Sequence, residues 1–165
     1  MAEVSESKRL WRTALIVAGV GLLILIPLGW LALRMWDDTI QRRVVAANEA
    51  ATLTYLEGIQ AAEDIYFRAN GQYGTIQQLI DSGFQPDVSG DPLVAHGYVL
   101  TVRVQPKTDT QPSSYSINAD PVRADGRDAT GRRHFFASAE VIGIRFNESR
   151  PATKDDKPRP KMAEY

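Results

Sequence analysis

The stretch that decides the fold is residues 40–67, IQRRVVAANEAATLTYLEGIQAAEDIYF, in which apolar side chains recur every three or four residues. That spacing is typical of one face of an α-helix. The apolar stripe contains Ile40, Val44, Ala47, Ala51, Tyr55, Leu56, Ile59, Ala62, Tyr66 and Phe67. The polar face contains Gln41, Glu49, Glu57, Gln60, Glu63 and Asp64. We expect a long amphipathic helix from Asp37 to Asn70, capped by Gly71.

After this helix, the chain alternates between turn signals and short strand patterns. Thr75 and Gln78 form a capping-box pair that predicts a short second helix, and Gly83 would end it. Alternation with a period of two then predicts four strands, the last two joined by a tight turn at Ala139-Glu140. The strands are Gly97–Val104, Ser114–Ala119, Arg132–Ser138 and Val141–Phe146. The sequence therefore predicts an α+β fold in which the long helix covers one face of a four-stranded antiparallel sheet.

Upstream of the long helix, residues Ala14–Leu33 read ALIVAGVGLLILIPLGWLAL and carry no charge. About 20 residues of helix span about 30 Å, the thickness of a hydrocarbon core, so we expect a single transmembrane helix that extends into the long helix. The alternative is a cleaved signal peptide, but its apolar region is usually shorter and ends at small residues. The residues expected to form the membrane anchor are Trp11, Ala14, Ala18, Gly21, Pro27, Trp30 and Trp36.

The composition excludes several kinds of site. The 165-residue chain contains no Cys, which excludes disulfides, thiolate catalysis, zinc–thiolate sites and iron–sulfur clusters within it. A net charge of −1 gives no general case for nucleic-acid binding. His96 and His134 lie in separate segments, and no phosphate-binding loop or nucleophile elbow occurs. We expect no catalytic site and no cofactor.

One acidic loop is a candidate cation site. Asp120, Asp125 and Asp128 lie within residues 120–131, DPVRADGRDATG, and carboxylate oxygens are the ligands that calcium prefers. The spacing is not that of an EF-hand, and Arg123 and Arg127 would oppose a cation. A plain turn is the favoured interpretation.

Several segments, taken in order, resemble type IV pilin-like proteins. Residues 43–50, RVVAANEA, and 71–74, GQYG, resemble their helix and early loop. Residues 115–121, YSINADP, are similar to their central sheet, and residues 133–145 resemble their last hairpin. The resemblance covers residues 42–153 and implies a pilin-like domain outside the cytoplasm. The N-terminal signature of pilins and pseudopilins is absent, because residues 8–14, KRLWRTA, lack the Gly of the processing site and no Glu lies in the apolar span. We therefore expect the pilin-like domain to be carried on an uncleaved transmembrane anchor.

These features predict four regions: a polar tail (1–13), a transmembrane helix (14–36), a pilin-like extracytoplasmic domain (37–147) and a polar, Pro-rich tail (148–165) whose composition is typical of disorder. Basic residues flank both ends of the apolar span in equal number, so charge leaves the orientation open. The resemblance places the N-terminus in the cytoplasm and the domain in the periplasm, on the bacterial inner membrane.

The expected function is that of a non-catalytic, membrane-anchored accessory or structural subunit of a multi-protein inner-membrane complex. Such a complex could be respiratory or photosynthetic, or a pilus or secretion machine. The expected partners are other integral-membrane protein subunits and the lipid bilayer, without nucleic acid or a small-molecule substrate. The alternative is a divergent pseudopilin or minor pilin of a type II secretion or type IV pilus system. An enzyme would need a polar pocket with at least two convergent titrating groups.

Overall fold

The computed structural model describes residues 3–85 and 93–159, with side chains described for residues 23, 25–31, 34–85 and 93–159. The chain forms two compact units, Met1–Ile40 and Gln41–Tyr165. Helix α1, Glu3–Asn70, contributes to both of them. Each unit is described by itself below.

In the first unit, the expected membrane anchor is not supported. Among the residues whose side chains are described, no helix is long and apolar enough to cross a membrane. This finding overturns the predicted transmembrane helix, the single-pass anchor and the inner-membrane localisation.

The residues expected to form that anchor are only partly described. Trp11, Ala14, Ala18 and Gly21 lie outside the described side chains. Pro27 lies inside α1, and Trp30 and Trp36 are exposed. The guanidinium of Arg34 lies over the Trp30 ring, 4.2 Å from its centre, which is a cation–π contact within the helix.

In the second unit, α1 ends and the second helix begins where the sequence predicts. Helix α1 ends at Asn70, and Gly71 follows with a φ of +71°, a left-handed conformation that Gly adopts without a steric cost. The short helix α2, Ile76–Asp81, has Thr75 as its N-cap, and the capping box with Gln78 is complete. Both of these local predictions are confirmed.

The sheet has six antiparallel strands in sequential order, not four. The strands are β1 (Leu93–Ala95), β2 (Tyr98–Gln105), β3 (Ser114–Pro121), β4 (His134–Ser138), β5 (Val141–Asn147) and β6 (Lys157–Pro158). The four predicted strands correspond to β2–β5. The two edge strands, β1 and β6, have three and two residues, too few for an alternating pattern to stand out.

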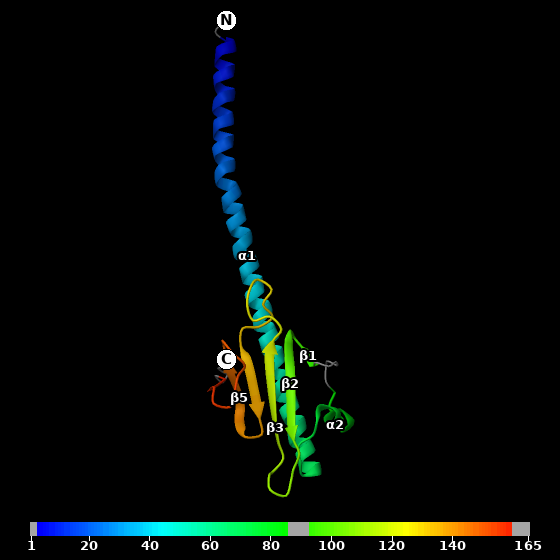
Figure 1. Cartoon of the computed structure of the whole chain (residues 1–165). Helices are drawn as coiled ribbons and strands as arrows, with labels where there is room; N and C mark the ends of the chain where they lie inside the picture. Colours follow the sequence, from blue (N-terminus) through cyan, green and yellow to red (C-terminus); the bar gives the residue numbers. More distant parts are fainter. Residues whose placement is uncertain (1–2, 86–92, 160–165) are drawn as a thin grey trace, which may run out of the picture. The chain divides into compact units, whose positions relative to one another are not determined.

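The core lies between α1 and one face of the sheet, which runs alongside the last part of α1 (Figure 1). Leu56 and Ile59 of α1 are completely buried, as is Leu79 of α2. They share one cluster with alternate residues of β3, Tyr115, Ile117 and Ala119. This alternation shows a sheet with one face packed on the helix.

The buried face of α1 differs from the predicted stripe. Glu49 and Glu63, predicted on the polar face, are buried, as is Thr52. Val44, predicted in the stripe, is exposed, and its neighbour Val45 is buried instead. The stripe is misplaced because the two glutamates find hydrogen-bond donors across the fold, which makes their burial tolerable.

The segment after β5 is folded as far as Arg159, although its composition is typical of disorder. The Asp156 carboxylate accepts hydrogen bonds from Asn147 Nδ2, from the Thr153 backbone N–H and from the Arg150 guanidinium. Ala152 is buried, and its carbonyl accepts a hydrogen bond from Asn118 Nδ2 on β3. These local hydrogen bonds order the segment without the periodic apolar pattern from which its structure could have been predicted.

Candidate functional site

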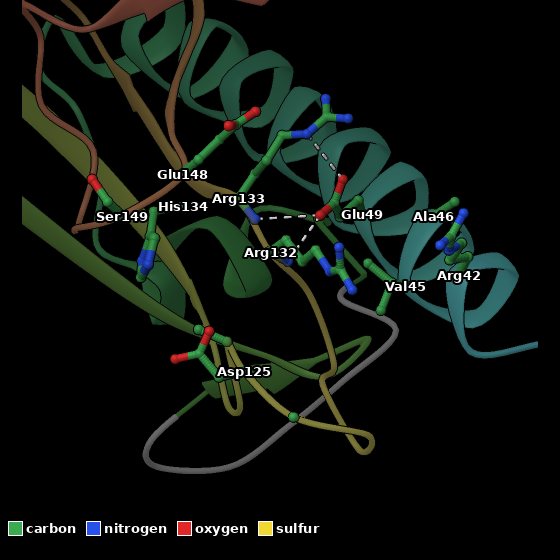
Figure 2. A pocket seen from close by; sticks show the side chains of 12 residues that line it. Arg42, Val45, Ala46, Glu49, Asp125, Arg132, Arg133, His134, Glu148 and Ser149 are labelled. Atoms are coloured by element: carbon green, nitrogen blue, oxygen red, sulfur yellow. Dashed lines mark hydrogen bonds and ion pairs between the residues drawn. The ribbon is translucent and has the colours of Figure 1, made fainter. Parts of the chain in front are cut away.

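The candidate site is a groove of about 780 Å³ in the second unit, between α1, the loop after β3, the start of β4 and the residues after β5. This volume lies within the range of about 300–1,000 Å³ that is typical of ligand sites. Charged side chains dominate its walls, as Figure 2 shows. The lining residues used below are Arg42, Val45, Ala46, Glu49, Asp125, Arg132, Arg133, His134, Glu148 and Ser149.

Glu49 fixes the centre of the groove. Its Oε1 accepts hydrogen bonds from the backbone N–H groups of Arg132 (2.9 Å) and Arg133 (3.3 Å). Its Oε2 lies 3.3 Å from Arg133 Nε, an ion pair drawn in Figure 2. A buried carboxylate with two main-chain donors and a guanidinium is fully compensated, so Glu49 holds the start of β4 against α1.

Further polar contacts attach the loop 122–133 to α1 and to β2. Gln41 Nε2 donates to the Ala129 carbonyl (2.7 Å), and Asn48 Nδ2 donates to the Thr130 carbonyl (2.9 Å). The Tyr98 hydroxyl donates to the Arg133 carbonyl (2.9 Å), and its burial raises the pKa of this phenol. The groove is therefore rigidly framed on its α1 side.

A histidine–carboxylate pair lies at another part of the groove. His134 Nδ1 and Asp120 Oδ1 are 2.6 Å apart, and the two residues come from the adjacent strands β4 and β3. Such a pair orients the base in a Ser-His-Asp triad. The hydroxyl of Ser149, in the same groove, instead donates to Asn147 Oδ1 (3.1 Å). Among the described residues, no hydroxyl is hydrogen-bonded to His134.

Two arginines of the groove have no charged partner in the part of the chain that the structure describes. Among the described residues, the guanidinium groups of Arg42 and Arg132 form no ion pair, and both side chains are exposed. Arg132 contributes only its backbone N–H to Glu49. Asp125 and Glu148 also line the groove without an ion pair in the described part of the chain. The groove thus offers two cations and two anions to a ligand.

The predicted acidic loop does not gather into a metal site. Asp120 lies within β3 and bonds to His134, whereas Asp125 lines the groove. The backbone carbonyl of Asp128 accepts a hydrogen bond from Arg123 Nε. In the part of the chain that the structure describes, no group of three acidic or histidine side chains could hold a metal ion.

A second carboxylate lies outside the groove, on the next turns of α1. Glu63 is completely buried, its Oε2 accepts a hydrogen bond from the Gly74 N–H (2.9 Å), and its Oε1 has no partner among the described residues. Burial, opposed by that hydrogen bond, raises the pKa of Glu63 to about 7. Glu63 is not one of the residues that line the groove.

Sequence reasoning missed the groove, since it placed Glu49 on the polar face of the long helix and Arg132 only at the start of a predicted strand. The signal that could have found it is weak: two adjacent arginines at the start of a strand that resembles the last pilin-like hairpin. The chain matches no protein-family model, no curated protein and no solved structure. The geometry of the groove therefore carries the functional argument.

Proposed function

We propose that the chain is a non-catalytic accessory subunit that docks on a partner protein through the groove beside α1. The observation that carries this proposal is that Arg42 and Arg132, in a groove whose frame is fixed by Glu49, form no ion pair with any described residue. A groove whose walls are already held in place and that contains unpaired charges favours recognition of another molecule. Binding then costs little conformational entropy, because few side chains have to become ordered.

The chemistry of the groove supports binding more than catalysis. Its buried carboxylate, Glu49, is engaged with three donors of its own chain, and His134 is engaged with Asp120. An acid–base catalyst instead needs a group that is poised toward a substrate and titrates near the working pH. We infer that these buried groups position the walls of the groove.

The test is native mass spectrometry of the complex, extracted gently from the organism that makes the chain and separated by size. We expect other protein subunits in a fixed ratio to this chain. A chain that runs alone as a monomer at its native abundance would contradict the proposal.

A divergent pseudopilin or minor pilin is the second candidate. It is favoured by the packing of a long helix on an antiparallel sheet, which the resemblance to pilin-like proteins implied. This candidate predicts a shortened N-terminus in the mature chain, and the same mass spectrum measures it. A mature chain that retains Ala2 counts against processing by a prepilin peptidase.

A further inference from the structure

The chemistry of the groove restricts what its partner can be. Arg42 on α1 and Arg132 before β4 are more than 80 residues apart in sequence, yet both line the same groove. In Figure 2 the Arg132 side chain extends on the side of the groove where Val45 and Arg42 lie. A guanidinium presents a planar fork of donors that fits a carboxylate in two parallel bonds. The α1 side of the groove therefore suits a carboxylate.

The other charges of the groove exclude densely anionic ligands. Asp125 and Glu148 line the same groove and would repel a nucleic-acid backbone or a multiply charged phosphate. They would attract a cation placed a few residues from the carboxylate. Charge complementarity thus favours a ligand that carries one or two carboxylates and, close by, a basic group.

The apolar lining points to a polypeptide. Val45 and Ala46 of α1 and Ala124 of the opposite loop lie among the charged residues of the groove. A peptide segment presents small apolar side chains between its charges, and a volume of about 780 Å³ accommodates several residues. An inorganic ion would contact only a small part of this lining.

We propose that the groove binds an extended segment of a partner protein in which an acidic residue, held by Arg42 and Arg132, lies a few residues from a basic one. This proposal rests on the proposed function and names the chemistry of the partner. Arg133 takes no direct part, because Glu49 already engages its Nε.

The probe is a fluorescein-labelled hexapeptide, Glu-Glu-Ala-Ala-Lys-Lys, titrated into the full-length chain at low salt and followed by fluorescence polarisation. The matched control peptide has Gln in place of both Glu. The double variant Arg42→Gln, Arg132→Gln should bind the acidic peptide at least about tenfold more weakly, because it loses two charge-assisted bonds. The matched control variant is Arg103→Gln, which changes an exposed arginine of β2 that is not among the groove residues.

We expect the wild type and Arg103→Gln to bind the acidic peptide equally well and to bind the Gln peptide at least about tenfold more weakly. The arginine Nε–H signals of Arg42 and Arg132 in NMR spectra should shift during the titration. Unchanged affinity of the double variant, equal binding of the two peptides, or no binding of the acidic peptide at 1 mM (roughly the limit of weak specific recognition) would overturn the proposal.

A second measurement separates this proposal from the proposed function. If the double variant still co-purifies with the same partners in the same ratio as the wild type, the acidic-segment proposal fails and the accessory-subunit proposal stands. If the wild-type chain co-purifies with no partner, the accessory-subunit proposal itself fails.

Discussion

Glu63 lies in an environment that disfavours its charged form. Its carboxyl group is completely buried, with one oxygen bonded to the Gly74 N–H and the other without a partner among the described residues. Burial raises the pKa of Glu63 most strongly, the hydrogen bond from the Gly74 N–H lowers it, and the nearby charge of Asp64 on the same helix raises it. Tyr73 and Tyr115 lie nearby, and burial raises the pKa of both phenols, so they stay neutral when Glu63 titrates.

The raised pKa predicts that stability falls with rising pH. The pKa of Glu63 is about 7 in the fold and 4.5 in its ordinary environment, so the folded chain binds more protons between these values. The free energy of unfolding should therefore decrease as pH rises from about 4.5 to about 7 and then level off. Glu63→Gln should remove this decrease and raise stability at pH 8 by up to about 3 kcal/mol. Urea unfolding at pH 5 and pH 8 measures both effects.

Glu148→Gln is the matched control for that change, because Glu148 is exposed and has no ion pair among the described residues. Its stability should follow the wild-type dependence on pH. A Glu63→Gln variant that keeps the wild-type slope between pH 5 and pH 8 would contradict the raised pKa.

Replacement of glycine by alanine should have opposite effects on stability at Gly131 and at Gly58. A Cβ at Gly131 would overlap the hydroxyl of Tyr98, whose ring is completely buried and cannot move aside, whereas a Cβ at Gly58 would lie 4.0 Å from Phe84. Gly131→Ala should therefore cost about 1–3 kcal/mol through overpacking. Gly58→Ala should stabilise α1 by about 0.4–1 kcal/mol, because it restricts the unfolded chain. Thermal unfolding of both variants tests the pair, and a stable Gly131→Ala protein would be inconsistent with the packing.

At the scale of elements, the packing of α1 on the sheet rests on the side chains that the structure buries. Leu56→Ala should destabilise the fold by about 2–5 kcal/mol, because Leu56 is 0% exposed within the core. Val44→Ala, on the predicted stripe but 45% exposed, should change stability by less than about 0.5 kcal/mol. Equal effects of the two variants in urea unfolding would mean that the original stripe was correct.

The hydrogen bonds of Asp156 should hold the segment after β5 in place. Asp156 binds Asn147, Arg150 and Thr153 at once, and these bonds lower its pKa to about 2. Asp156→Ala should release residues 148–159 from β5, so that their amides exchange faster in hydrogen-exchange measurements while those of β3 stay protected. Asp155→Ala, at the exposed neighbouring position, is the control. Unchanged exchange in Asp156→Ala would show that the segment is held by its other contacts, such as the pairing of β6 with β5 and the hydrogen bond from Asn118 to Ala152.

Local signals made part of the fold predictable. The capping box at Thr75 and the glycine after Asn70 depend on residues within a few positions, and the alternation of β2–β5 depends on one sheet face. The six-stranded sheet could not be predicted in full, because β1 and β6 are too short for an alternating pattern to stand out.

The groove was beyond sequence reasoning for a related reason. Glu49 and Arg132 look solvated in the sequence, and only tertiary structure supplies the two backbone donors that let Glu49 be buried. No pattern within one element contains that information. The expected membrane anchor was inferred from apolar length, and the described side chains do not bear it out.

At the scale of the whole molecule, the second unit contains the core. Among the described residues, every buried side chain lies at Val45 or later. A chain that begins at Gln41 should therefore fold alone, with a Tm within about 4 °C of the full-length value, which corresponds to about 1 kcal/mol. Amide dispersion in NMR spectra and thermal unfolding measure this. A truncated chain with collapsed dispersion would show that the first unit is needed for folding.

The hydrogen bond between Glu49 and Arg132 has a consequence for folding during translation. The carboxylate leaves the exit tunnel 83 residues before the backbone donor that satisfies it. At about 5–20 residues per second, synthesis of that interval takes roughly 4–17 seconds. For the first part of this time, until β2 and β3 have been synthesised, Leu56 and Ile59 have no strands to cover them. The nascent helix is therefore a natural substrate for chaperones that bind apolar segments, and slowed translation between α1 and β4 should lower the yield of soluble chain.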